Sequence, residues 1–215
     1  MILKRRLNQL LFATIAAFSL AAGYWFSQSS QQTALPNIPN DFEATVFPEP
    51  RELIPFKLID QDEQPFTPEQ LKQKWSLLFF GFTHCPDVCP TTLKVLQDFW
   101  QGLPESMRQT TQVVFITVDP NRDTAPIIKD YVQFFEPSFL GVTGNLGHIT
   151  AFTRSLGILY EYVSTGKGEN NYGVNHSAQI ILIDPQARLR AVFPPPHDPD
   201  EMRKNYLTIV DFYKG

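Results

Sequence analysis

Hydrophobic and polar positions divide the chain into three regions. An apolar stretch covers residues 7–26, and a polar stretch rich in Ser, Gln and Pro covers 27–50. From residue 51 onward, short apolar runs alternate with mixed segments, and the runs 75–82 and 112–119 are continuous. Continuous apolar runs of this length are typical of strands buried on both faces of a sheet. The pattern predicts a membrane or export segment, a stalk and one folded domain.

Strands and helices are predicted to alternate within 51–215. Besides the two buried strands, the pattern predicts strands at 53–60, 157–163, 178–185 and 188–193, and helices at 68–71, 91–104, 125–135, 145–157 and 198–215. Strand–helix–strand units followed by a hairpin and a terminal helix indicate an α/β fold with a central mixed sheet flanked by helices. By analogy, a cysteine pair directly after the first long buried strand is typical of thioredoxin-like folds.

Residues 1–26 are predicted to be a transmembrane anchor. A basic cluster at 4–6 precedes the apolar run, and aromatic residues at 24–25 close it. A run of about 20 apolar residues spans a bilayer, and the basic cluster should stay in the cytoplasm. A cleaved signal peptide is the alternative, because 19–21 resembles a cleavage site. Both interpretations export the domain, and 27–50 would be a stalk that lifts it off the membrane.

Composition and charge narrow the class of partner. The chain has 215 residues, 43% of them hydrophobic, and a net charge of −4 with no basic stripe in its body. A mildly acidic domain argues against nucleic acid as a partner. The chain has two cysteines, which are too few for a disulfide scaffold.

Both cysteines lie in GFTHCPDVCP, residues 81–90, and each precedes a proline. The residue before proline is disfavoured in helical geometry, so neither cysteine is expected inside a helix. Pro90 suits the first position of the following helix, which makes Cys89 the predicted N-cap. The positive end of the helix dipole would then favour the Cys89 thiolate.

The spacing of the pair bears on its chemistry. A thioredoxin-type redox pair has two intervening residues, and here there are three. The longer loop relaxes the geometry that a disulfide demands and favours two thiolates that bind one metal ion and can also oxidise. A purely structural disulfide is the third interpretation, and closing so short a loop gains little.

A third metal ligand is expected among the four histidines. His176 stands immediately before a buried strand, where a ligand would be rigidly held. His84 is next to Cys85, but the side chains of neighbours in an extended loop tend to point apart. His148 is expected to be a core or surface residue. His197 is expected to be solvated. Two thiolates and one imidazole select copper, with zinc second. No fourth strong ligand is evident, which argues against a closed structural zinc site.

Three segments together resemble the Sco/SenC family of copper chaperones. They are GFTHCPDVCPTTL (81–93), VDPNRDT (118–124) and YGVNHSAQIILID (172–184), and their order and intervals match over about residues 53–214. The resemblance implies a thioredoxin-like domain that binds one copper ion, Cu(I) or Cu(II), through two cysteines and a histidine. It also implies a role in assembling the binuclear copper centre of cytochrome c oxidase subunit II.

Carried over to this chain, the family pattern makes Cys85, Cys89 and His176 the copper ligands. Asp119 and Asp123 match acidic positions near the metal site. They would form hydrogen bonds around it or contact a partner, and the alternative is that Asp-Pro-Asn simply makes a turn.

Two further positions bear on the resemblance. Asp87, between the cysteines, would meet the partner or shape the loop. Asn175 stands where the family usually has Asp before the ligand histidine, which removes a charge near the metal and would lower imidazole basicity. No mitochondrial transit peptide is visible, so we expect a single-pass protein of the bacterial inner membrane with its domain in the periplasm.

Three functional hypotheses remain. The first is a chaperone that delivers copper to, or prepares the thiols of, the oxidase copper centre, with subunit II and other copper chaperones as partners. The alternative is a thiol–disulfide oxidoreductase that acts through Cys85 and Cys89, with Cys85 attacking. The third is a peroxidase, loosely suggested by Thr83 and Pro86.

Overall fold

The computed structural model describes residues 14–25, 42–164, 166 and 172–214. It divides into two compact units, before and after residue 39, which are considered separately. In the first unit, residues 14–25 are helical. Within the described part of the chain, no helix combines the length and apolar character needed to cross a membrane. Most of the predicted anchor and stalk falls outside these residues.

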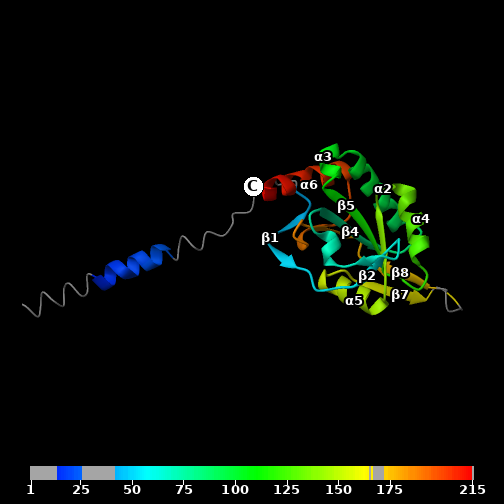
Figure 1. The fold of residues 1–215 in the computed structure, drawn as a ribbon, viewed down its shortest axis with the longest axis horizontal. Helices are drawn as coiled ribbons and strands as arrows, with labels where there is room; N and C mark the ends of the chain where they lie inside the picture. Colours follow the sequence, from blue (N-terminus) through cyan, green and yellow to red (C-terminus); the bar gives the residue numbers. More distant parts are fainter. Residues whose placement is uncertain (1–13, 26–41, 165, 167–171, 215) are drawn as a thin grey trace, which may run out of the picture. The chain divides into compact units, whose positions relative to one another are not determined.

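The second unit is built on an eight-stranded mixed sheet (Figure 1) with the order β1-β10-β9-β4-β5-β6-β2-β3. Strand β4 pairs in parallel with β5, and β5 with β6, whereas the other pairings are antiparallel. The strands are β1 (Thr45–Glu52), β2 (Leu58–Asp60), β3 (Pro65–Phe66), β4 (Trp75–Gly81), β5 (Thr111–Thr117), β6 (Leu140–Thr143), β9 (Ile180–Ile183) and β10 (Arg188–Phe193).

Helices cover both faces of this sheet. They are the 3₁₀ helix η1 (Pro68–Leu71) and the α-helices α2 (Val88–Gln101), α3 (Glu105–Arg108), α4 (Ala125–Phe135), α5 (Leu146–Ser155) and α6 (Pro199–Lys214). Helix α2 contacts both α4 and α6, so these three form one layer. In the view of Figure 1, α5 lies apart from them, at the lower edge of the domain.

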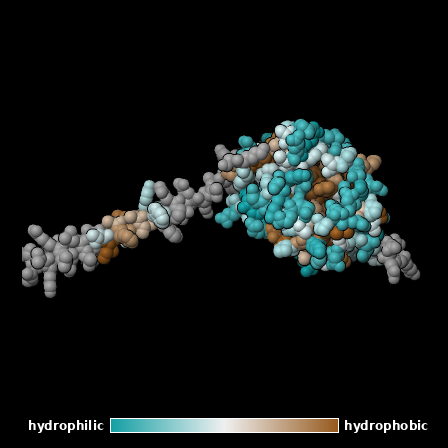
Figure 2. Space-filling model, in the orientation of Figure 1, coloured by the Kyte–Doolittle hydropathy of each residue, from teal (hydrophilic) through white to brown (hydrophobic). Residues whose placement is uncertain are grey.

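Consecutive phenylalanines in β4 point to opposite faces of the sheet. Phe79 packs near Phe115, which in turn packs against Tyr131 of α4. Phe80 instead packs against Phe152 of α5. Because both faces are covered, all residues of β4 and β5 are buried, which confirms the prediction from their continuous apolar runs. The face in view in Figure 2 is mostly hydrophilic, with smaller hydrophobic areas between.

A separate two-stranded hairpin lies next to the main sheet. Its strands are β7 (Tyr160–Ser164) and β8 (Tyr172–His176), which pair antiparallel. The sequence predicted the first of these strands but not the second, because GVNH lacks the apolar run that marked the others. The hairpin carries His176 at the end of β8.

Some predicted boundaries were wrong. Strand β1 begins at Thr45, inside the range assigned to the stalk, and pairs with β10 at the edge of the sheet. Its prolines at 48 and 50 obscured it, and an edge strand tolerates proline because one side of its backbone needs no partner. The predicted strand 53–60 is reduced to β2, and the short elements β3, β6 and α3 were not predicted.

Candidate metal centre

The cysteine loop connects the end of β4 to the start of α2. Helix α2 begins at Val88, with Asp87 as its N-cap. The prediction that Cys89 is the N-cap and lies outside the helix was therefore wrong, since it is the second helical residue. Pro90 occupies the third position, which is compatible with a helix because the first backbone N–H groups have no intrahelical partner.

The start of α2 donates a backbone hydrogen bond to the sulfur of Cys85 rather than to that of Cys89. The backbone N–H of Cys89 donates to the Cys85 sulfur at 3.4 Å. Cys85 is half-buried, Cys89 is buried, and the two are not joined by a disulfide. Gly81 packs closely against Cys89, because a Cβ added to Gly81 would lie only 2.6 Å from the Cys89 sulfur. Glycine at the end of β4 is therefore required by close packing.

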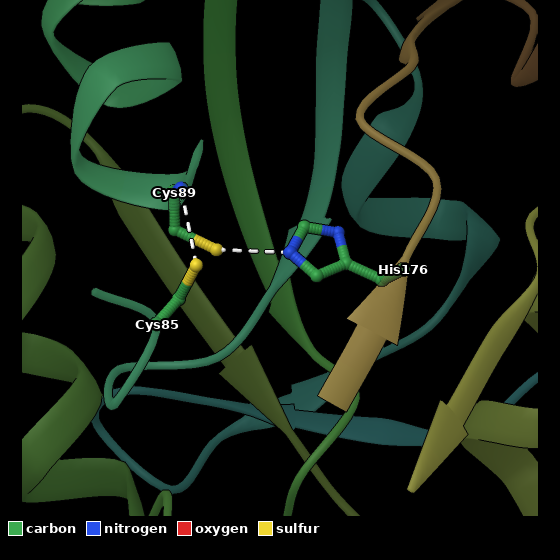
Figure 3. A group of neighbouring side chains, drawn as sticks. All are labelled: Cys85, Cys89 and His176. Atoms are coloured by element: carbon green, nitrogen blue, oxygen red, sulfur yellow. Dashed lines mark hydrogen bonds between the residues drawn. The ribbon is translucent and has the colours of Figure 1, made fainter. Parts of the chain in front are cut away.

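His176 reaches the cysteines from the opposite side (Figure 3). Its Nε2 lies 3.2 Å from the Cys89 sulfur, and its Nδ1 lies 3.2 Å from the backbone oxygen of Ser177. If Nδ1 donates to that carbonyl, Nε2 keeps its lone pair toward the thiols, as a metal ligand requires. The rings of Phe79 and Phe82 pack edge-on against the imidazole, with centroids 6.1 and 5.9 Å away. Nothing in the sequence pattern indicated this aromatic support.

The three predicted ligands therefore meet at one place. One ligand atom each from Cys85, Cys89 and His176 lies within 4.8 Å of the others. Cys85 and His176 border a pocket of about 380 Å³ that lies between the cysteine loop and β8. Two soft sulfurs and one imidazole nitrogen form a donor set that suits copper.

The pKa values of the two cysteines are shifted in opposite directions. The pKa of Cys85 is lowered to about 4, first by the hydrogen bond from the Cys89 side chain and further by the backbone N–H groups of Asp87 and Cys89, against the effect of burial. The same hydrogen bond and burial raise the pKa of Cys89. The sequence had assigned the favoured thiolate to Cys89, and this assignment was wrong because Cys85 is the sulfur that accepts the hydrogen bonds, first from the Cys89 side chain and then from the backbone N–H groups at the start of α2.

This difference predicts how the reduced, metal-free protein reacts with iodoacetamide. Because its folded pKa is depressed, Cys85 stays a thiolate above about pH 5, so its labelling rate should be nearly flat from pH 5.5 to 8. The labelling rate of an ordinary thiol falls about tenfold for each pH unit below its pKa. Site-resolved mass spectrometry measures both rates. In the Cys89→Ala variant, which lacks the main hydrogen bond to Cys85, Cys85 should be labelled more slowly at pH 5.5. Preferential labelling of Cys89 in the wild-type protein would contradict the assignment.

Comparison with known proteins identifies the family. The model of the family described as SCO1/SenC matches residues 47–211. The chain belongs to the SCO1/SenC family. A Stutzerimonas stutzeri protein, named as a candidate copper-binding protein, is 37% identical over 166 residues, which cover 77% of this chain and 80% of that one.

Solved structures of SCO1/SenC proteins share the fold. Arabidopsis thaliana ScoI with copper bound has a TM-score of 0.69 and 33% identity, over 74% of this chain and 98% of that one. BsSco, described as a member of the Sco family of cytochrome c oxidase assembly proteins, has a TM-score of 0.57 and 21% identity, over 74% of this chain and 94% of its own. The latter supports the fold alone. The predicted thioredoxin-like fold with a central mixed sheet is therefore confirmed.

In this SCO1/SenC protein, Asp119 and Asp123 are fully buried. Asp123 accepts hydrogen bonds from the backbone N–H of Thr83 at 3.0 Å, the Thr83 hydroxyl at 2.5 Å and the Thr117 hydroxyl at 2.6 Å. Asp119 accepts hydrogen bonds from Tyr172 and Arg122. Burial makes docking contacts the wrong interpretation for both residues, which instead hold the segments that carry the candidate ligands.

Asp87 and Asn175 are both exposed and line the pocket. Asp87 accepts a hydrogen bond at 3.4 Å from the Thr91 hydroxyl, which fits the expectation that it shapes the loop. The Nδ1 atom of His176 contacts the backbone oxygen of Ser177, so the neighbour at this nitrogen is Ser177 rather than Asn175.

The remaining histidines point elsewhere. His84 lies near Thr83 and Asp123, and the Nδ1 of His148 contacts the backbone oxygen of Lys57. His197 was expected to be solvated, but it is half-buried with its Nε2 2.7 Å from the backbone oxygen of Ala178, and burial lowers its pKa. The preference for His176 therefore agrees with the geometry.

Proposed function

We propose that this SCO1/SenC protein is a membrane-anchored copper chaperone. It takes up one copper ion at Cys85, Cys89 and His176 and delivers it to, or prepares the thiols of, the binuclear copper centre of cytochrome c oxidase subunit II. The observation that carries this proposal is the meeting of two sulfurs and one imidazole nitrogen within 4.8 Å. The copper-bound structure of the related Arabidopsis ScoI supports it.

The site is suited to releasing its cargo as well as holding it. Cys85 and His176 are only partly buried, whereas Cys89 lies against the protein core. Ligands of an incoming partner can therefore displace the exposed donors one at a time, and Cys89 releases the ion last. Three donors bind copper but leave one side of the ion open to an incoming ligand. A closed four-ligand site has no such open side.

The basic cluster at 4–6 and the apolar stretch 7–26 support an inner-membrane location, with the domain in the periplasm. There the domain would meet the oxidase subunit and any chaperone that supplies the copper. Protease treatment of intact and lysed spheroplasts tests this topology, and digestion only after lysis would contradict it.

A copper titration of the full-length protein tests the function. We expect one copper ion per wild-type chain and none retained by the Cys85→Ser/Cys89→Ser double variant, because serine lacks the soft donor that copper(I) prefers. Far-UV circular dichroism checks that the variant is folded. In cells lacking the wild-type gene, the variant should also fail to restore oxidase activity. Undiminished copper binding by the double variant would overturn the proposal.

Thiol–disulfide exchange is the second candidate, favoured by the stabilised Cys85 thiolate. The Cys85 thiolate attacks a partner disulfide and forms a mixed disulfide, while one partner thiolate leaves. Cys89 then loses its proton and attacks the Cys85 sulfur, which releases the second partner thiolate. The partner gains two electrons, and the chain is left with a Cys85–Cys89 disulfide.

A further inference from the structure

The 118–124 loop, which joins β5 to α4, contacts both halves of the proposed copper site. Through Asp123 it holds Thr83, two residues before Cys85. Through Asp119 and Arg122 it holds Tyr172, four residues before His176. One loop therefore fixes the cysteine segment and the histidine segment relative to each other.

Asp119, Arg122 and Tyr172 form a closed set of contacts, here called the clasp. The Arg122 Nε donates to the Asp119 carboxylate, and its Nη1 donates to the backbone oxygen of Tyr172 at 3.0 Å. The Tyr172 hydroxyl donates to Asp119 Oδ1 at 2.7 Å. The guanidinium also lies over the Tyr172 ring, 3.8 Å from its centroid. Charge, hydrogen bonds and stacking thus converge on the first residue of β8.

The clasp matters because the hairpin is not a strand pair of the main sheet. Strands β7 and β8 pair with each other in a sheet of their own. Side-chain contacts therefore help to fix the hairpin in place. Besides the clasp, Tyr162 donates to the Val118 oxygen at 2.5 Å, and Tyr160 lies 2.6 Å from the Thr150 hydroxyl.

We propose that Arg122 and Tyr172 are positioning residues that hold His176 against the thiols and thereby set the affinity of the site for copper(II). The proposal rests on the copper-binding function proposed above. Copper(I) is well served by soft thiolates, whereas copper(II) favours nitrogen donors in a defined geometry. Loosening the hairpin therefore weakens binding of copper(II) more than binding of copper(I).

The test compares full-length wild type with Arg122→Gln, Tyr172→Phe and the control Tyr206→Phe. The Tyr206 hydroxyl makes a buried 2.6 Å hydrogen bond to Thr111, so the control loses the same chemical group away from the site. Competition titrations measure copper(I) and copper(II) affinities, and pulsed EPR detects the imidazole nitrogen bound to copper(II).

Arg122→Gln should weaken copper(II) binding about tenfold, because the charged hydrogen bonds that hold the start of β8 are lost. Its imidazole signal should fall, and its copper(I) affinity should change less than about threefold. Tyr172→Phe, which keeps the ring, should show a smaller loss of the same kind, and Tyr206→Phe should show none.

Unchanged copper(II) affinity and imidazole signal in both clasp variants would overturn the positioning role. Equal losses for both oxidation states, shared by Tyr206→Phe, would also overturn it, because they would reflect general destabilisation. Neither result affects the proposed function, which fails only if the wild-type chain binds no copper through Cys85, Cys89 and His176.

Discussion

Replacing His176 by alanine is expected to weaken copper(II) binding by at least about 100-fold, because even groups behind the metal ligands contribute about 10–100-fold. Its Nε2 is the nitrogen that faces the two sulfurs. Reduction of a small test disulfide by Cys85 should keep the same order of rate, since His176 makes the smallest of the contributions that lower the pKa of Cys85. Competition titration and a stopped-flow exchange assay measure the two properties.

The His176→Ala result also separates the two candidate functions. If the variant loses oxidase assembly in cells but keeps disulfide exchange, thiol chemistry alone is not the function. His148→Ala is the matched control, because His148 is exposed and contacts the backbone of Lys57. Full copper(II) affinity in His176→Ala would mean that the imidazole is not a ligand, and a large loss in His148→Ala would point to a nonspecific effect.

Asp123→Ala is expected to lower the free energy of unfolding by about 3 kcal/mol, because it leaves three hydrogen-bond donors in a buried site without their acceptor. Copper affinity should fall as well, since Thr83 and the cysteine loop behind it lose their attachment to the end of β5. Urea unfolding, followed by fluorescence, measures the midpoint and the slope.

The control for Asp123→Ala is Asp62→Ala. Asp62 forms an exposed ion pair with Lys129 at 2.6 Å, and such pairs contribute less than about 1 kcal/mol. A midpoint for Asp123→Ala that moved no further than the control would show that the buried carboxylate is not a structural anchor. A changed slope would instead indicate an altered unfolded or native state.

The parts of the fold that the sequence predicts well are those that burial alone determines. Strands β4 and β5 are covered on both faces, so each appears as a continuous apolar run. Strand β1 lies at an edge and contains prolines, and β8 is held largely by its partner strand and side-chain contacts. Such strands have no comparable local pattern, because tertiary contacts rather than local preference stabilise them.

The candidate ligands were predictable from residue type, but their electrostatics were not. Cys85, Cys89 and His176 were named from softness, spacing and position. Which sulfur is the thiolate depends on which one accepts the hydrogen bonds from the side chain and the backbone N–H of the other cysteine, and that is a matter of a few ångströms in the folded loop. The roles of Arg122 and Tyr172 depend equally on contacts between segments 50 residues apart.

The edge strand β1 has a consequence for how the domain behaves when many copies are crowded together. The strand contains Pro48 and Pro50 in the stretch between Val46 and Arg51 where its pairing with β10 is irregular, and charged Glu49 and Arg51 are exposed. Proline offers no N–H to a neighbouring backbone, and charges repel an incoming strand, so this edge is a poor template for intermolecular β-pairing and for fibril growth. The protein can therefore accumulate without polymerising along this side.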